Sequence, residues 1–157
     1  MSTRILFVCL GNICRSPMLE GVMRHKLARA GLADRVAVDS AGLGPWHAGN
    51  PPEPEAIDVC AAHGVAIGDL RARQLTQQDF ATFDWILCAD RANLKALHSL
   101  APRALWPRIA LALAWAGQGV KADVPDPYGG REEDFEKVYR LIDKATDGML
   151  DRLRLPA

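Results

Sequence analysis

The chain alternates short runs of hydrophobic residues with longer segments in which apolar residues recur every three to four positions. The first run, residues 5–9, is continuous and of strand length, which is typical of a strand buried on both faces of a parallel sheet. We expect it to be the central strand. Further strands are predicted at residues 36–40, 85–88 and 104–111. Pro107 leaves the start of the last strand undefined, and a helix in this segment stays an alternative.

Helical periodicity fills the segments between these strands. Apolar residues at positions 19, 22, 23, 27 and 30 lie on one face of a helix that Ser16 would cap, Pro17 would begin and Gly31 would end. Further helical segments are predicted at about residues 53–63, at 74–83 as a short turn, from Asp90 onward, and at about 131–153. Residues 41–54 form a Gly- and Pro-rich loop that is long enough to carry function.

Strands that alternate with helices are typical of an α/β fold with a parallel sheet and right-handed crossovers. Ligands of such folds bind at the carboxyl ends of the strands. A length of 157 residues and a hydrophobic share of 49% agree with a single globular domain over residues 1–157.

Composition and charge argue against several classes of protein. The longest apolar run, residues 109–116, is far shorter than the roughly 20 residues of a membrane-spanning helix. The N-terminal apolar stretch does not have the pattern of a signal peptide, so we expect a cytoplasmic protein. Nineteen Lys and Arg balance nineteen Asp and Glu, which argues against nucleic-acid or membrane binding. The four cysteines and four histidines lack the spacing of a disulfide scaffold or a zinc site, and we expect no metal ion and no cofactor.

Positive charge is concentrated at the start of the chain. Residues 1–31 contain five Lys and Arg against Glu20 alone, whereas residues 123–151 are rich in acids. Two interpretations stay open, because such runs are either solvated helix faces or, near the N-terminus, part of an anion site.

The segment between the first strand and the first helix is the strongest candidate for chemistry. It reads Cys9-Leu10-Gly11-Asn12-Ile13-Cys14-Arg15-Ser16. A loop of this length at a helix N-terminus can turn its backbone N–H groups inward around an anion, and Arg15 can bind two phosphoryl oxygens through its planar fork. Helix N-termini and nearby cations favour the thiolate, the reactive form of cysteine, which would make Cys9 a nucleophile. The alternative is that Cys9 is a small buried hydrophobic residue.

A second candidate is Asp126, in a loop just before the last predicted helix. Pro125 and Pro127 flank it, restrict the backbone and hold the carboxyl group at a fixed point. A mechanism through a cysteinyl phosphate needs a group that protonates the leaving oxygen and later deprotonates water. Alone, Asp126 would be an ordinary turn residue, but together with the cysteine loop it predicts a general acid and base.

These two motifs, in this order and near opposite ends of the chain, resemble those of the low-molecular-weight protein tyrosine phosphatases. The resemblance covers nearly the whole chain and includes the segments 39–42, 46–49, 52–54, 72–74, 79–80, 83–87 and 90–94. It implies a three-layer domain of the flavodoxin or Rossmann type, with a four-stranded parallel sheet between helices. The implied activity is the hydrolysis of phosphotyrosine in proteins, with a tyrosine kinase as the counterpart.

The resemblance also implies roles for individual residues. Cys9 would be the nucleophile, Arg15 the phosphate clamp, and Asp126 the general acid and then base. Leu10, Gly11, Asn12, Ile13, Cys14 and Ser16 would form the substrate-binding loop, in which Asn12 holds the shape and Ser16 assists departure of the thiolate. Trp46 and Tyr128 would flank the phosphotyrosine ring. Ile13 stands where arginine phosphatases of the family carry threonine, which favours phosphotyrosine.

The chain departs from the family pattern in two places. Gly129 stands where many members have a second tyrosine, and Leu70 and Arg71 stand where some place a histidine of the loop's hydrogen-bond network. A reversible disulfide between Cys9 and Cys14 is a further hypothesis, since it would protect an oxidised thiolate.

Two other functions are weighed against the phosphatase. An arsenate reductase of the same fold would relay oxidation from Cys9 to two further cysteines. Only Cys60 and Cys88 could take this role, and they do not form the closely spaced cysteine pair that such enzymes use. A phosphate or phosphopeptide sensor, or a phosphocysteine carrier, would bind without turnover, and Asp126 argues against it.

Overall fold

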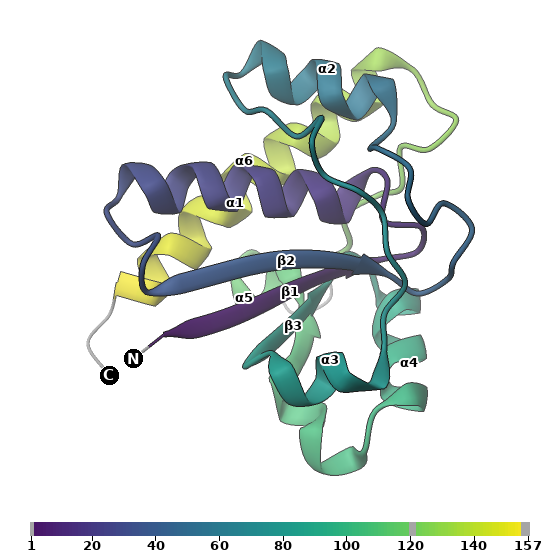
Figure 1. Cartoon of the computed structure of the whole chain (residues 1–157). Helices are drawn as coiled ribbons and strands as arrows, with labels where there is room; N and C mark the ends of the chain where they lie inside the picture. Colours follow the sequence, from purple (N-terminus) through teal and green to yellow (C-terminus); the bar gives the residue numbers. More distant parts are fainter. Residues whose placement is uncertain (1, 120–121, 155–157) are drawn as a thin grey trace.

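The computed structural model describes residues 2–119 and 122–154 and contains one four-stranded parallel sheet (Figure 1). The strand order is β2-β1-β3-β4, with β1 (Thr3–Cys9), β2 (Val36–Gly42), β3 (Trp85–Cys88) and β4 (Ile109–Leu111). β1 pairs with both β2 and β3, and its residues 5–9 are buried. The predicted α/β class, the parallel sheet and the central position of the first strand are therefore confirmed.

Helices cover both faces of the sheet. They are α1 (Arg15–Arg29), α2 (Pro54–Ala62), α3 (Gln77–Thr82), α4 (Arg91–Leu100), α5 (Ala112–Trp115) and α6 (Glu132–Arg154). Figure 1 shows α1, α2 and α6 on one side of the sheet and α3 and α4 on the other. The carboxyl ends of the strands lie at the right of this view, together with the loops that follow β1 and β2.

The alternation of side chains along β1 divides the core in two. Ile5 and Phe7 belong to a cluster with α1, α2, α5 and α6, whereas Leu6 and Val8 belong to one with α3 and α4. All four side chains are fully buried, because successive residues of a strand point to opposite faces. This double burial explains why the run lacks polar residues.

The predicted start of the first helix is wrong by two residues. α1 begins at Arg15, with Cys14 as the N-cap residue, and no side chain caps it. Ser16 does not serve as the cap because its hydroxyl group is hydrogen-bonded within the preceding loop. Pro17 is tolerated because the first four N–H groups of a helix have no intrahelical partner. The end agrees with the prediction, since Gly31 follows it at a φ of 73°.

The fourth strand is also shorter than predicted. Only Ile109–Leu111 is strand, and the preceding segment forms a 3-10 helix, η1 (Arg103–Arg108). Pro107 has no N–H to donate to a sheet, and Trp106 donates from Nε1 to the Ala101 carbonyl instead.

The remaining boundaries differ by a few residues. β2 runs on to Gly42, two residues beyond its predicted end, and Gln74 pairs with Gly42 in an isolated bridge, so α3 starts only at Gln77. The helices predicted at 53–63 and 131–153 are confirmed to within one residue at each end. Asp90 is the N-cap residue of α4. In the parts of the chain that the structure describes, no helix is long and apolar enough to cross a membrane.

Candidate active site

The loop between β1 and α1 forms the floor of the site. Cys9 ends β1, and Arg15 begins α1. Both side chains are buried, and the Cys9 sulfur accepts from the backbone N–H of Asn12 at 3.3 Å. Ser16 Oγ lies 3.0 Å from Cys9 Sγ in a second hydrogen bond. The thiol therefore sits between polar groups at the carboxyl end of the central strand.

The backbone of this loop uses its carbonyl groups in hydrogen bonds and leaves several N–H groups without a partner among the described residues. The carbonyls of Cys9, Leu10 and Ile13 accept from the N–H groups of Leu43, Gly44 and Glu53. By contrast, the N–H groups of Gly11, Ile13 and Cys14 make no hydrogen bond to any described residue. Unpaired N–H groups around a helix N-terminus are suited to bind an anion.

Asn12 holds the loop in this shape. Its φ is 60°, and it is the one described non-glycine residue with a positive φ, a conformation that asparagine tolerates better than most residues. Its Nδ2 donates to Ser16 Oγ at 2.7 Å and to Ser40 Oγ at 3.0 Å. Ser40 in turn donates to the buried carboxylate of Glu20 at 2.7 Å. Burial raises the pKa of Glu20, although Ser40 and Arg24 partly oppose that shift.

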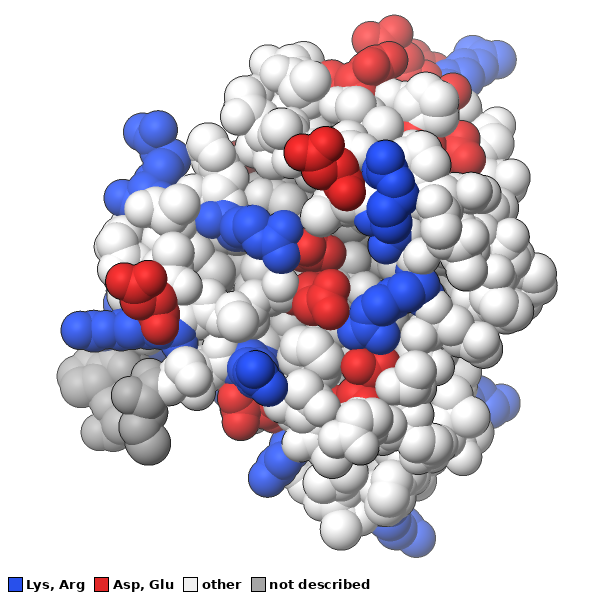
Figure 2. All heavy atoms as spheres, in the orientation of Figure 1, with Lys and Arg blue, Asp and Glu red and all other residues white. Residues whose placement is uncertain are grey.

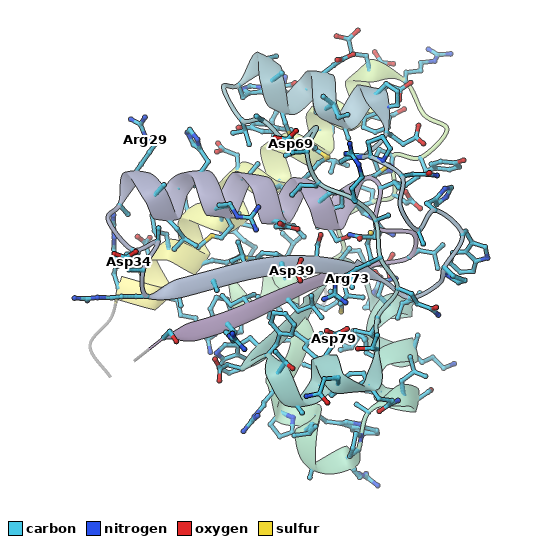
Figure 3. All side chains as sticks on the ribbon, in the orientation of Figure 1. Arg29, Asp34, Asp39, Asp69, Arg73 and Asp79 are labelled. Carbon is cyan, nitrogen blue, oxygen red and sulfur yellow. The ribbon has the colours of Figure 1, made fainter. Side chains whose placement is uncertain are left out.

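Arg73 supports Asn12 from the other side. Its backbone N–H donates to Asn12 Oδ1 at 3.0 Å, and its guanidinium group reaches Asp39 and Asp79 at 3.1 and 3.0 Å. Figure 3 shows Arg73 pointing between these two carboxylates, which come from β2 and α3. Local spacing indicates no role for Ser40, Glu20 or Arg73, because the partners in this network are distant in sequence.

Arg15 is fixed by groups from two other segments. Its Nη1 donates to Asp90 Oδ2 at 2.6 Å and to the Val124 carbonyl at 2.9 Å. Burial by itself lowers the pKa of Arg15, but the hydrogen bond to Asp90 and the negative charges of Cys9 and Asp126 shift it upward overall. Asp90 was predicted only to begin a helix. Its position two residues after β3, at the ligand-binding edge of a parallel sheet, is the feature that could have identified it.

Asp126 lies at the mouth of the same pocket. Its carboxylate is 3.7 Å from Arg15 Nη2 and accepts from the N–H of Tyr128 at 3.1 Å. The Asp126 side chain is 44% exposed, so it is accessible to solvent and to a bound molecule. Thus Cys9, Arg15 and Asp126 are brought together as the motifs predicted.

The pocket has a volume of about 230 Å³. It is lined by Cys9, Leu10, Gly11, Ile13, Cys14, Arg15, Trp46, His47, Asp126 and Tyr128. Trp46 and Tyr128 are 64% and 57% exposed, so two aromatic rings stand free at its rim. The motifs indicated no role for His47, but its ring lies beside that of Tyr128, with 6.0 Å between the two ring centroids. Asn12 and Ser16 support the loop from beneath and do not line the pocket.

The four cysteines are free thiols, and all are buried. Burial, with the charges of Cys9 and Asp126, raises the pKa of Cys14 strongly. Burial also raises the pKa values of Cys60 and Cys88 to about 12. Cys60 and Cys88 belong to different hydrophobic clusters, an arrangement that does not favour a relay of oxidation between them. The Cys9–Cys14 disulfide stays a prediction.

Comparison with known proteins assigns the chain to a family. Residues 4–155 match the sequence model described as low molecular weight phosphotyrosine protein phosphatase. The chain belongs to this family. It is therefore an enzyme of the protein tyrosine phosphatase class, and family membership implies phosphotyrosine-containing proteins as substrates.

Individual relatives of this phosphatase agree with the assignment. The low molecular weight protein-tyrosine-phosphatase YfkJ of Bacillus subtilis is 40% identical over 146 residues, which are 93% of this chain and 92% of that protein. Its crystal structure superposes with a TM-score of 0.91 at 38% identity, covering 98% and 96% of the two chains. Wzb of Vibrio vulnificus, solved in complex with benzylphosphonate, has a TM-score of 0.84 at 33% identity and covers 97% and 99%. These likenesses confirm the three-layer, Rossmann-like fold.

Proposed function

We propose that this phosphatase hydrolyses phosphotyrosine through a covalent phosphate ester on Cys9. The observation that carries the proposal is that one pocket contains the Cys9 sulfur, the Arg15 guanidinium group and the Asp126 carboxylate. A thiolate, a phosphate clamp and an acid at the entrance are the groups that a two-step displacement at phosphorus needs.

The phosphoryl group would lie above Cys9 in the cradle of the loop. The N–H groups of Gly11, Ile13 and Cys14 are available as donors to its oxygens. Arg15 would add two parallel hydrogen bonds from Nε and Nη2, since Nη1 is engaged by Asp90 and Val124. These donors are fixed before the reaction, so they stabilise the charge on the equatorial oxygens in the transition state.

In the first step the Cys9 thiolate attacks phosphorus in line and the bond to the phenolic oxygen breaks. Asp126 protonates that oxygen as it departs. In the second step Asp126 takes a proton from a water molecule, which attacks phosphorus and releases the Cys9 thiolate and inorganic phosphate. Ser16, 3.0 Å from Cys9 Sγ, can donate to the departing thiolate.

The rim of the pocket favours a flat aromatic ester. Trp46 and Tyr128 would flank the phosphotyrosine ring, while Ile13 provides an apolar wall. Benzylphosphonate, the ligand of the Vibrio relative, likewise combines an aromatic ring with a phosphorus oxyanion. A tyrosine kinase would produce the substrate, and a reducing compartment such as the cytoplasm would keep Cys9 reduced.

The test is steady-state hydrolysis of a phosphotyrosine peptide, a phosphoserine peptide and phosphoarginine in the presence of a chelator, by the wild type and by Cys9→Ser. We expect turnover of the phosphotyrosine peptide only, with loss in Cys9→Ser by at least about 10³-fold, because a hydroxyl group is a far poorer nucleophile than a thiolate. Retained phosphate binding by Cys9→Ser would show that the pocket is intact. Preferred turnover of phosphoarginine would contradict the substrate assignment, and phosphate binding without any turnover would favour a sensor.

A further inference from the structure

A second surface, outside the active site, carries positive charge, and of its basic residues only Arg91 forms an ion pair with a described residue. Residues 91–118 contain four Arg and Lys and no Asp or Glu, although the chain as a whole is neutral. Among the described residues, no carboxylate forms an ion pair with Lys95, Arg103 or Arg108. The lower right of Figure 2, where α4 and η1 lie, shows Lys and Arg atoms and no Asp or Glu atoms.

This surface contains a shallow, open groove of about 530 Å³. Its lining residues, which define the α4 groove, are Arg91, Leu94, Lys95, His98, Ser99 and Trp106. Arg91, Lys95 and His98 recur at helical spacing, so they point to the same side of α4.

Trp106 lines the groove from η1, and two side chains lie against its ring. The imidazole ring of His98 stacks on it at a centroid distance of 4.3 Å, and the Arg103 guanidinium carbon lies 5.2 Å from its ring centroid. Cation–π contacts of this kind hold a guanidinium group near an apolar surface. The groove thus combines positive charge with an apolar wall.

The α4 groove starts beside the active site. Asp90, the residue that caps α4, accepts a hydrogen bond from Arg15. The next residue, Arg91, forms an ion pair with Asp123 at 3.2 Å. Asp123 directly precedes Val124, whose carbonyl also accepts from Arg15. At about 1.5 Å per residue, Lys95 and His98 lie roughly 8 and 12 Å along the helix axis from Asp90. An extended peptide spans about 3.3 Å per residue, so about three to four residues cover this distance.

We propose that the α4 groove docks an acidic segment of the phosphoprotein substrate, located about three to four residues from the phosphotyrosine. The inference rests on the proposed function and adds a substrate class to it. The carboxylates of Asp and Glu side chains complement Lys95 and Arg103, and the backbone packs against Leu94 and Trp106. Such complementary charges mainly increase the rate of encounter and the apparent affinity, and less the chemical step.

The experiment compares phosphotyrosine peptides that carry a four-residue run of Asp and Glu, placed either before or after the phosphotyrosine, with matched peptides that carry Asn and Gln. For the wild type at low ionic strength we expect one acidic peptide to have a kcat/KM about fivefold above its neutral partner, through KM, with the difference fading in salt. Lys95→Gln/Arg103→Gln should abolish this preference without changing turnover of the neutral peptides. Lys137→Gln/Lys144→Gln, which removes two exposed charges from α6, is the control and should keep it.

A second readout does not need catalysis. Fluorescence anisotropy of a labelled, unphosphorylated acidic peptide should show binding to the wild type and to the α6 control, and a loss of at least about threefold in affinity for the α4 variant.

Each alternative outcome is informative. Equal kcat/KM for acidic and neutral peptides, or a preference that survives Lys95→Gln/Arg103→Gln, would overturn the docking inference while leaving the phosphatase proposal intact. Absence of turnover of every peptide would instead overturn the proposed function, and the anisotropy measurement would still decide the groove. A labelled single-stranded oligonucleotide that binds the groove more tightly than the acidic peptide would also overturn the inference.

Discussion

At the scale of single residues, Gly42 shows how a missing side chain positions the loop of Cys9. A Cβ atom at this position would lie 3.0 Å from the Gly11 carbonyl carbon, 3.1 Å from Asn12 Cβ and 3.1 Å from the Leu10 carbonyl oxygen. Two of these three atoms are backbone, which cannot move aside as a flexible side chain can. The loop of Cys9 therefore rests directly on the end of β2.

Gly42→Ala tests this contact. We expect the substitution to lower the free energy of unfolding by about 1–3 kcal/mol and to weaken phosphate binding, since the loop must shift away from β2. Gly68→Ala is the matched control, because a Cβ there meets no atom within 4 Å. Chemical denaturation and phosphate titration measure both quantities, and equal behaviour of the two variants would contradict the role of Gly42.

Asp126→Asn tests the general acid at the same scale. Because an amide cannot supply the proton, kcat/KM for phenyl phosphate should fall by about 10²–10⁴-fold, and that for 4-nitrophenyl phosphate much less, since nitrophenolate departs without protonation. Glu132→Gln, an exposed carboxylate at the start of α6, should leave both values unchanged. Equal losses with the two esters would exclude the acid role of Asp126.

At the scale of secondary-structure elements, two aspartates connect helix ends to the active site. Asp90 accepts from the Asn93 N–H through Oδ1 and from Arg15 through Oδ2, so the cap of α4 also orients the Arg15 side chain. Asp79 accepts from the Thr76 N–H at the start of α3 and pairs with Arg73, whose N–H supports Asn12. A change at either helix end is therefore expected to reach the loop of Cys9.

The Asp79 contacts predict a pH-dependent contribution to stability. Burial by itself raises the pKa of Asp79, but the hydrogen bonds from Arg73 and Thr76 lower it below its ordinary value overall. The contribution is thus present above the ordinary aspartate pKa of about 3.9 and is lost as the pH falls through the lowered value. Asp79→Asn should reduce the free energy of unfolding by about 1–3 kcal/mol at pH 7, with a smaller difference at acid pH.

Urea denaturation of Asp79→Asn across pH 2–7 measures this dependence. The control is Asp69→Asn, at an exposed aspartate that has no hydrogen bond or ion pair with the described residues. A stability difference for Asp79→Asn that stays constant down to pH 2 would contradict the electrostatic explanation.

At the scale of the whole molecule, α6 closes the core on one face of the sheet. Its buried stripe packs against α1 and α2, with Phe135, Val138, Ile142, Ala145 and Met149 in the larger hydrophobic cluster. The predicted stripe is confirmed except at Leu153, which is only partly buried. α6 follows directly after the loop of Asp126, so its packing anchors that loop as well.

Neighbouring residues on α6 make a matched pair. Ile142 is fully buried, whereas Leu141 is 37% exposed. Ile142→Ala should lower the free energy of unfolding by about 2–5 kcal/mol, and Leu141→Ala by less than about 1 kcal/mol, because only the first leaves a cavity. Thermal and chemical denaturation measure the difference. Similar losses in both variants would mean that α6 does not pack as described.

Some features could be predicted because they depend on neighbours in the chain. The strand of residues 5–9, the stripe of α6 and the Cys-x5-Arg loop follow from local hydrophobic periodicity and local spacing. The boundary at Ser16 was wrong for the same reason, since its hydroxyl group is bound by Cys9 and Asn12 and does not cap the helix. The short β4 reflects a similar competition, in which Pro107 and Trp106 favour a turn.

The amino-acid sequence by itself determined the fold class, the loop around Cys9 and the pairing of that loop with an aspartate near the other end of the chain. Only the tertiary structure decided that Asp90 and the Val124 carbonyl hold Arg15, that Ser40, Glu20 and Arg73 support Asn12, and that His47 enters the pocket. The physical reason is distance along the chain. Periodicity reports which face of an element is buried, whereas contacts between far segments depend on how the strands align and how the helices pack.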